Sequence, residues 1–270
     1  MKRMTVLCIF LTTMLVSLSS YAGSIQIKGS TTVLPIAQKI AEAFMKEYPT
    51  ISISISGGGS GNGIKALIDG TTDIADSSRF ISQKEIKLAV NNGRYPVPFA
   101  VAYDCIIPVV HPSNPVSNLT IKQLREIYTG KIRNWKELGG PDMKIVVISR
   151  DTSSGTYEVW EKKVLREARV FPGAQLQASN GAVAEAVAHN KHAIGYIGLG
   201  YLNRHLKAIK VNGIMGSAAT ALDGSYPISR PLFMFTQGWP KGDVARFIKY
   251  VQDPNKGQKL VKQVGFIPLY

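Results

Sequence analysis

Apolar and polar residues alternate in two patterns along this chain. Residues 25–28 and 51–55 alternate with a period of two, which is typical of half-buried strands. Residues 35–48 instead place apolar side chains three or four positions apart, as one face of a helix requires. Residues 145–148 are continuously apolar, as expected of a strand that is covered on both faces. Strands that alternate with helices in this way predict α/β lobes with largely parallel sheets.

Local start signals indicate further helices. Ser82 is followed three residues later by Glu85, and Thr120 by Gln123, which is the spacing of a capping box. In that motif each of the two side chains bonds the backbone amide of the other residue. The helical pattern recurs over residues 157–168, 183–189 and 243–252.

The chain has no internal repeat and no low-complexity linker, so two lobes would have to be joined by strands or short crossings and not by a flexible tether. Residues 101–110 and 226–235 are apolar, strand-like and interrupted by proline, and each could cross once between lobes. We therefore predict a discontinuous first lobe, residues 23–103 with 224–270, and a second lobe, residues 104–223.

The first 22 residues have the layout of a secretory signal peptide. A basic start is followed by the apolar residues 6–16 and by small residues up to Ala22. A transmembrane anchor is the alternative, but a spanning helix needs about 20 apolar residues. We expect cleavage after Ala22 and export of the mature protein to the periplasm.

The charge is strongly positive but dispersed. The formal net charge of +14 falls to +12 on cleavage, because the leader contains Lys2 and Arg3 and no acid. Lysine and arginine are scattered without a basic block or an interleaved aromatic pattern, so we expect no nucleic-acid partner. A positive field would assist the capture of anions. Only Cys105 survives cleavage, which excludes an intramolecular disulfide and a cysteine metal site.

Three polar loops share one physical design. Residues 29–32, 57–63 and 150–156 each follow a predicted strand and lead into a predicted helix. Each loop therefore places hydroxyl groups, free backbone amides and the positive end of a helix dipole at the carboxyl end of a strand, which suits an anion. Serine and threonine also cap helices routinely, so one such loop alone means little.

Arg150, at the start of the third loop, strengthens the interpretation. A guanidinium group can grip two oxygens of a tetrahedral anion, and a hydrogen bond to a charged group contributes about 1.5–3 kcal/mol. Micromolar binding corresponds to about 8 kcal/mol in net terms, so a few such bonds suffice.

Taken in order, six strings make the chain resemble the phosphate-binding proteins of bacterial ABC-type phosphate importers. They are GSTTVLP (29–35), GSGNGIKAL (59–67), DIADSSR (73–79), RDTSSGT (150–156), AIGY (193–196) and YPISRP (226–231). The resemblance implies a two-lobed α/β periplasmic-binding-protein fold of type II with two chain crossings between the lobes.

The resemblance also implies a function. It suggests a monomeric protein that is not an enzyme, needs no cofactor, captures inorganic phosphate and delivers it to the permease subunits of an ABC transporter. Another tetrahedral oxyanion, such as sulfate, tungstate or molybdate, stays open as the ligand.

Carried over position by position, the resemblance names the phosphate-binding residues. Closure of the lobes would bring groups of the second loop set onto an anion already held by the first. The expected ligands are Ser30, Thr31, Thr32 and Ser60 from one lobe and Arg150, Ser154, Gly155 and Thr156 from the other.

Ser78 and Arg79 depart from the family pattern. Some members carry an aspartate at the position of Ser78, and this carboxylate accepts the proton of hydrogen phosphate and repels sulfate. A serine can accept the hydrogen bond but cannot repel, which puts the discrimination against sulfate in doubt. Arg79 is either a second cation on the ligand or the partner of a nearby acid such as Asp76.

Two other classes of function compete with this reading. A serine hydrolase would need Ser60 or Ser154 in a Gly-x-Ser-x-Gly elbow, and neither lies in one. A secreted phosphatase would need a nucleophile or a metal site, and the four histidines form no evident ligand set. An adhesin would need a partner surface, and the sequence has no large exposed apolar stripe.

Overall fold

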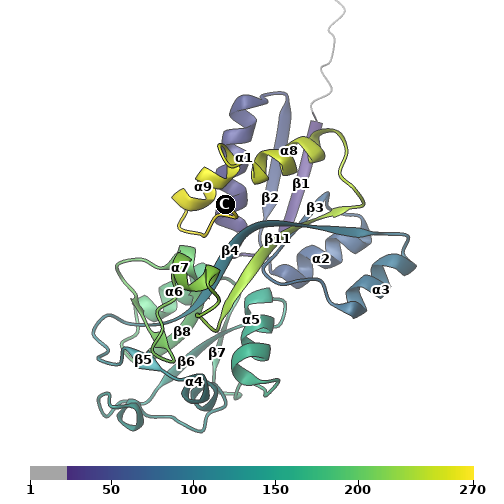
Figure 1. The fold of residues 1–270 in the computed structure, drawn as a ribbon. Helices are drawn as coiled ribbons and strands as arrows, with labels where there is room; N and C mark the ends of the chain where they lie inside the picture. The colour runs from purple at the N-terminus through teal and green to yellow at the C-terminus, as the bar shows by residue number, and fades with distance from the viewer. Residues whose placement is uncertain (1–22) are drawn as a thin grey trace, which may run out of the picture.

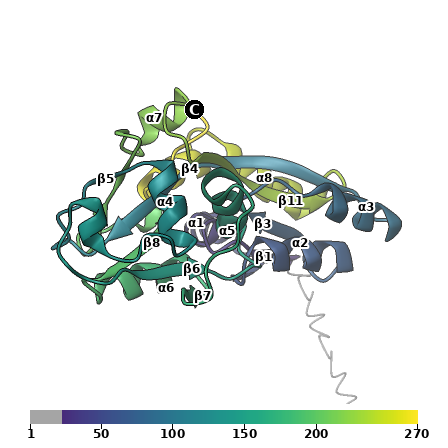
Figure 2. The same ribbon diagram turned by 90° about the horizontal axis from the view of Figure 1, so that it is seen from below.

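A computed structural model describes residues 23–270 as two lobes joined by two long strands (Figure 1). The predicted signal peptide and its cleavage site after Ala22 lie outside the described residues. The joining strands are β4 (Pro96–Val110) and β11 (Ser229–Gln237), which run side by side in Figures 1 and 2. No helix within residues 23–270 is long and apolar enough to cross a membrane.

The first lobe contains a parallel sheet that begins at the amino-terminal end of the described chain. The strands β2 and β3 flank β1 on either side, both parallel to it. These strands are β1 (Gly23–Gly29), β2 (Ile51–Ser56) and β3 (Ile74–Ser77). The helices of this lobe are α1 (Leu34–Glu47), α2 (Ser60–Asp69), α3 (Gln83–Asn91), α8 (Gly242–Gln252) and α9 (Gly257–Gln263). Each parallel strand therefore delivers its carboxyl end to the same edge of the sheet.

The second lobe has its own parallel strands and several short elements. The strand β6 lies between β7 and β8 and is parallel to both. The strands are β5 (Asn118–Leu119), β6 (Val146–Arg150), β7 (Gln175–Gln177), β8 (Ala193–Gly198), β9 (Lys207–Ala208) and β10 (Lys210–Val211). The helices are α4 (Ile121–Tyr128), α5 (Gly155–Trp160), α6 (Asn180–Ala188) and α7 (Ala218–Leu222). Three single turns complete it: η1 (Trp135–Leu138), η2 (Glu161–Leu165) and η3 (Leu199–Tyr201).

The strand β4 belongs to both lobes, which makes the sheet continuous. Its first half pairs antiparallel with β11, and its second half pairs antiparallel with β8. The order through the molecule is β2-β1-β3-β11-β4-β8-β6-β7. The register of β4 and β11 shifts between Leu232 and Phe233, an irregularity of the kind that bends a sheet. The two crossing segments predicted from the sequence overlap these strands.

The hydrophobic core divides at the same strands. Among the described residues the first lobe contains two clusters, one of which includes Val101, Ala102 and Leu232. The second lobe's cluster begins at Cys105 and includes Ile228. The second lobe's core is centred on three buried aromatic rings. Trp160 stacks on Tyr196 at 4.2 Å between ring centroids, and Tyr128 meets Trp160 edge-on at 5.0 Å. Such pairs contribute about 0.5–1.5 kcal/mol beyond the burial of their surface.

Most predicted elements are confirmed, and one is wrong in its extent. Both capping boxes form at the start of α3 and α4. The helix predicted over residues 157–168 does not run through: α5 ends at Trp160 and continues only as the π-turn η2. Arg166 and Glu167 then adopt left-handed backbone conformations, with φ of 51° and 65°. Neither is a glycine, so composition gave no signal that the helix ends there.

Candidate functional site

The three predicted loops meet where the two lobes face each other. The Gly59 amide donates to the Gly29 carbonyl at 2.9 Å, which joins the first two loops. The Gly61 amide donates to the Ser153 carbonyl at 3.0 Å, and the Ser153 hydroxyl donates to the Gly58 carbonyl at 3.1 Å. These last two bonds connect the first lobe to the second. The structure therefore represents a closed arrangement of the lobes.

A cluster of buried hydroxyl groups lies at this junction. The Oγ1 atoms of Thr32 and Thr156 are 2.9 Å apart, although the two residues belong to different lobes. The Asn180 amide, at the start of α6, donates to Thr31 Oγ1 at 3.1 Å and to Thr32 Oγ1 at 2.9 Å. All four side chains are buried. The predicted residues Thr31, Thr32 and Thr156 thus come together.

A second contact joins Ser60, Ser78 and Gly155. The Ser78 amide donates to Ser60 Oγ at 3.0 Å, and the two hydroxyl oxygens are 3.3 Å apart. A Cβ atom added at Gly155 would lie 2.8 Å from Ser78 Oγ, so only glycine allows the start of α5 to approach this closely. Ser154 caps α5 by accepting from the Tyr157 amide at 3.2 Å. Within residues 23–270 the amides of Gly155 and Thr156 have no hydrogen-bond partner.

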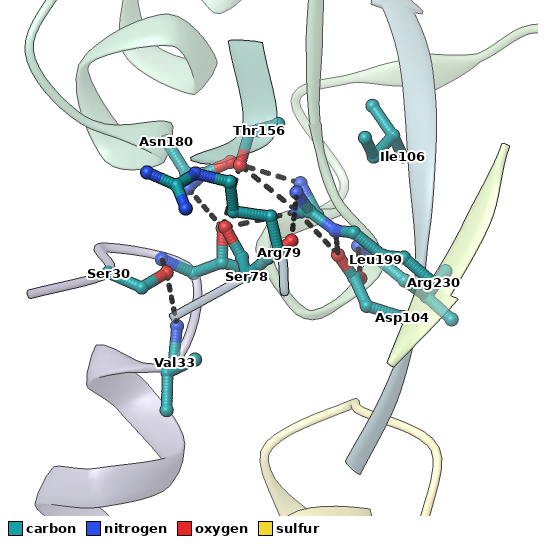
Figure 3. Close-up of polar contacts among 12 residues, drawn as sticks. Ser30, Val33, Ser78, Arg79, Asp104, Ile106, Thr156, Asn180, Leu199 and Arg230 are labelled. Atoms are coloured by element: carbon teal, nitrogen blue, oxygen red, sulfur yellow. Dashed lines mark hydrogen bonds and ion pairs between the residues drawn. The ribbon is translucent and has the colours of Figure 1, made fainter. Parts of the chain in front are cut away.

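Ser30 supports its own loop. Its hydroxyl oxygen accepts from the amides of Thr32 and Val33 at 3.1 and 3.3 Å, at the start of α1 (Figure 3). Its amide donates to the Asp76 carbonyl at 2.8 Å. Ser30 therefore fixes the loop that presents the two threonines.

A buried ion pair stands beside the hydroxyl cluster. Arg230 of β11 pairs with Asp104 of β4 through Nε at 3.1 Å and Nη2 at 2.8 Å (Figure 3). The same Nη2 donates to Thr156 Oγ1 at 3.0 Å and to Thr32 Oγ1 at 3.3 Å. Nη1 donates to the Ser78 carbonyl at 3.0 Å. Arg230 thus connects the crossing strands to groups from both lobes.

The carboxylate of this pair is fully buried. Burial raises the pKa of Asp104, although Arg230 and the Leu199 amide oppose the shift. Burial likewise lowers the pKa of Arg230, and Asp104 opposes that change. Each group keeps the other charged in a site that would otherwise disfavour either charge.

Arg150, the cation predicted in the third loop, is only 1% exposed. Its Nε and Nη2 donate to the Gln177 and Ala178 carbonyls, both at 3.0 Å. Its Nη1 is buried and has no partner among the described residues. Burial lowers the pKa of Arg150, Asp151 opposes the shift, and the nearby positive charge of Arg230 adds to it. A buried donor without a partner is rare in proteins and points to a missing acceptor.

Arg79 has its charge satisfied by two acids. It holds Glu85 with a fork of two bonds, at 2.8 and 2.7 Å, and its Nε lies 2.6 Å from Glu158. Of the two alternatives for Arg79, the structure shows pairing with nearby acids. These acids are Glu85 and Glu158, and no hydrogen bond or ion pair joins Arg79 to Asp76 within the described chain. Glu158 lies on α5, so the pair with Arg79 bridges the lobes.

Sequence reasoning missed Asn180, Arg230, Asp104 and Tyr201, the last of which donates its hydroxyl to the Thr31 carbonyl. Arg230 lies inside a string that carried the family resemblance, which was a usable signal. Asp104 and Asn180 gave none, because the contacts of Asp104 with Arg230 and of Asn180 with Thr32 join residues more than 100 positions apart. No group of three or more metal-ligating side chains occurs in the part of the chain that the structure describes.

Comparison with known proteins decides the family. The sequence profile of a PBP superfamily domain matches residues 18–255. The chain belongs to the PBP superfamily. Within this superfamily, the chain is 32% identical over 249 residues to the phosphate-binding protein PstS of Bacillus subtilis, covering 92% of this chain and 81% of the relative. It is also 32% identical over 255 residues to PstS of Borreliella burgdorferi, covering 90% and 89% of the two chains.

Solved structures agree with this assignment to the PBP superfamily. A putative phosphate ABC transporter substrate-binding protein from Clostridium perfringens, with bound phosphate, superposes with a TM-score of 0.85 at 34% identity, covering 92% of this chain and all of that one. An ABC-type phosphate transport receptor from Vibrio cholerae gives a TM-score of 0.74 at 32% identity, covering 90% and 99%. The predicted two-lobed type II fold is confirmed.

Proposed function

We propose that this protein captures inorganic phosphate outside the cytoplasm and delivers it to an ABC-type importer. The observation that carries the proposal is the junction of the lobes, where buried hydroxyl groups of both lobes meet. We infer that Arg150 Nη1, which is buried and has no partner among the described residues, donates to an anion held there. The names of the relatives support phosphate as the ligand.

The charges of the site suit an anion. Arg230 is balanced by Asp104, whereas within residues 23–270 Arg150 has a single ion pair, with Asp151, whose carboxylate is 3.9 Å away and partly exposed. One buried positive charge is thus left largely uncompensated, and the starts of α1, α2 and α5 add their partial positive charges. A bound phosphate would accept from these groups and satisfy the free donors.

Closure of the lobes lets groups from both of them contact the anion. In our proposal Thr31, Thr32 and Ser60 hold the anion first, with Ser30 fixing their loop. Arg150, Ser154, Gly155 and Thr156 then arrive with the second lobe. A ligand that contacts both lobes stabilises the closed state by its differential affinity. Arg79 acts in this scheme through its ion pair with Glu158 across the junction.

We propose that residues 23–103 and 224–270 form one lobe and residues 104–223 the other. The change of cluster between Ala102 and Cys105 supports the first limit. The change back lies between Ile228 and Leu232, a few residues after the second limit, and Ile267 also packs in the second lobe's core. We also infer a monomeric periplasmic protein that performs no catalysis and binds no nucleic acid. Besides phosphate, the partner we propose for this protein is the permease of the transporter.

Titration calorimetry tests the proposal. The mature protein, unfolded and refolded to remove bound anion, is titrated with phosphate and then with sulfate at neutral pH. We expect one phosphate per chain with an affinity of about micromolar or tighter. Weak sulfate binding would show that neutral groups discriminate between phosphate and sulfate, since Ser78 bears no charge. If neither anion binds, the proposed capture of phosphate is wrong.

A further inference from the structure

A second concave site lies on the second lobe, away from the junction with the first. It is a cavity of about 510 Å³ between α4, the loop that follows α4, and the chain after η2. Figure 1 shows α4 at the end of this lobe farthest from the first lobe. The site shares no residue with the proposed phosphate site.

Four cations line this cavity: Lys122, Arg125, Lys131 and Arg166. All four are exposed, and none forms an ion pair with a carboxylate anywhere in residues 23–270. Glu126 is the one acid of the lining, which leaves three net positive charges around a small volume. Like charges gathered in a concave surface repel one another and favour an anionic ligand.

The backbone is strained at Arg166, one of the residues that line the cavity. Arg166 and Glu167 are consecutive residues with positive φ, 51° and 65°, directly after the π-turn η2. A left-handed conformation is unfavourable for a residue other than glycine, because its Cβ approaches the following carbonyl oxygen. Strained backbone and π-turns both concentrate at functional sites.

Stabilisation of helix ends accounts for only part of this arrangement. Arg125 lies in the last turn of α4 and Arg166 follows η2, where cations offset the negative end of a helix dipole. Lys122 lies in the first turn of α4, at the positive end of the dipole, where a lysine is unfavourable. The dipole also gives no reason for two strained residues in succession.

We propose that this cavity binds a small molecule that carries several adjacent phosphoryl groups. The volume lies in the range of pockets for organic ligands, about 300–1,000 Å³, and exceeds what a single tetrahedral anion needs. Two guanidinium groups offer forks that match phosphoryl oxygens, and two ammonium groups add point charges. The ligand is either a condensed inorganic phosphate or the phosphate chain of a nucleotide.

Arg166 allows a variant that separates ligand binding from folding. Arg166→Gly removes the cation and at the same time relieves the backbone strain, so this variant should fold at least as well as the wild type. Glu167→Gly is the matched control, because it relieves the same kind of strain and removes no cation. A loss of binding in the first variant alone therefore reports the Arg166 side chain.

The experiment titrates the mature protein, in excess inorganic phosphate, with tripolyphosphate, ATP and hexaglutamate. We expect tripolyphosphate to bind one-to-one, Arg166→Gly to weaken it about tenfold or more, and Glu167→Gly to bind as tightly as the wild type or more tightly. ATP binding with the same response to Arg166→Gly would identify a nucleotide as the source of the phosphate chain, and binding of tripolyphosphate alone would identify condensed phosphate. The proposal is overturned if the wild type does not bind tripolyphosphate or if Arg166→Gly binds it equally well. It is also overturned if the wild type binds hexaglutamate as tightly as tripolyphosphate and Arg166→Gly weakens the binding of hexaglutamate too.

Discussion

Asp76 gives a sharp test of the electrostatics beside the loop of residues 29–32, because the Ser30 amide donates to its backbone carbonyl. Its side chain is 2% exposed and its Oδ1 has no hydrogen-bond partner in the described chain. Burial raises the pKa of this carboxyl group well above its ordinary value of 3.8. The native protein therefore keeps a proton on Asp76 at pH values where the unfolded chain has released it.

The sign of the effect on stability follows from this proton. Because the native state binds one more proton than the unfolded state, the free energy of unfolding falls as the pH rises from 3.8 to the native pKa. The slope is about 1.4 kcal/mol for each pH unit in that window. Asp76→Asn cannot ionise, so its stability relative to the wild type should rise by this amount per pH unit.

Urea unfolding followed by circular dichroism at several pH values upward from about pH 4, in buffer without phosphate, measures this difference. Asp76→Ala is a useful companion variant, because it leaves a small void and lowers the stability by a constant amount but should share the pH slope of Asp76→Asn. Parallel pH profiles for the wild type and Asp76→Asn would refute the reasoning.

Three further predictions concern the junction between the lobes. Arg150→Ala should weaken phosphate binding by roughly 10- to 150-fold in calorimetry, the value of one hydrogen bond to a charged group, and Arg150→Lys should recover only part of it; unchanged affinity in Arg150→Ala would remove the residue from the site. Gly155→Ala places a Cβ 2.8 Å from Ser78 Oγ, which should keep the two lobes from closing. The radius of gyration from small-angle scattering should therefore not decrease when phosphate is added. Glu158→Gln breaks the pair with Arg79 and should open the phosphate-free protein while weakening binding only severalfold; a closed variant would contradict this.

Local patterns predicted much of the fold. The apolar spacing of α1 and the capping boxes of α3 and α4 each depend on residues within one or two turns, and all three appear in the structure. The end of α5 could not be read in this way. Its π-turn and the left-handed Arg166 depend on how the segment packs, and arginine carries no preference for that conformation.

The site was predictable only in part for the same reason. The loops containing Thr32 and Thr156 were visible as strand-to-helix turns, and they do meet, at 2.9 Å between the two hydroxyl oxygens. Arg230 reaches Thr32 across 198 positions of sequence, and its partner Asp104 lies on the other crossing strand. Such contacts follow from the topology, and no single stretch of the sequence reveals them.

The most direct test of the central claim is a crystal structure of the stripped mature protein after phosphate has been added. The account predicts one tetrahedral anion between the lobes, with oxygens about 2.7–3.1 Å from Arg150 Nη1 and from donors of both lobes, including the Thr32 hydroxyl or the Gly155 amide. A junction that contains no anion at saturating phosphate, or an anion held by one lobe alone, would contradict it.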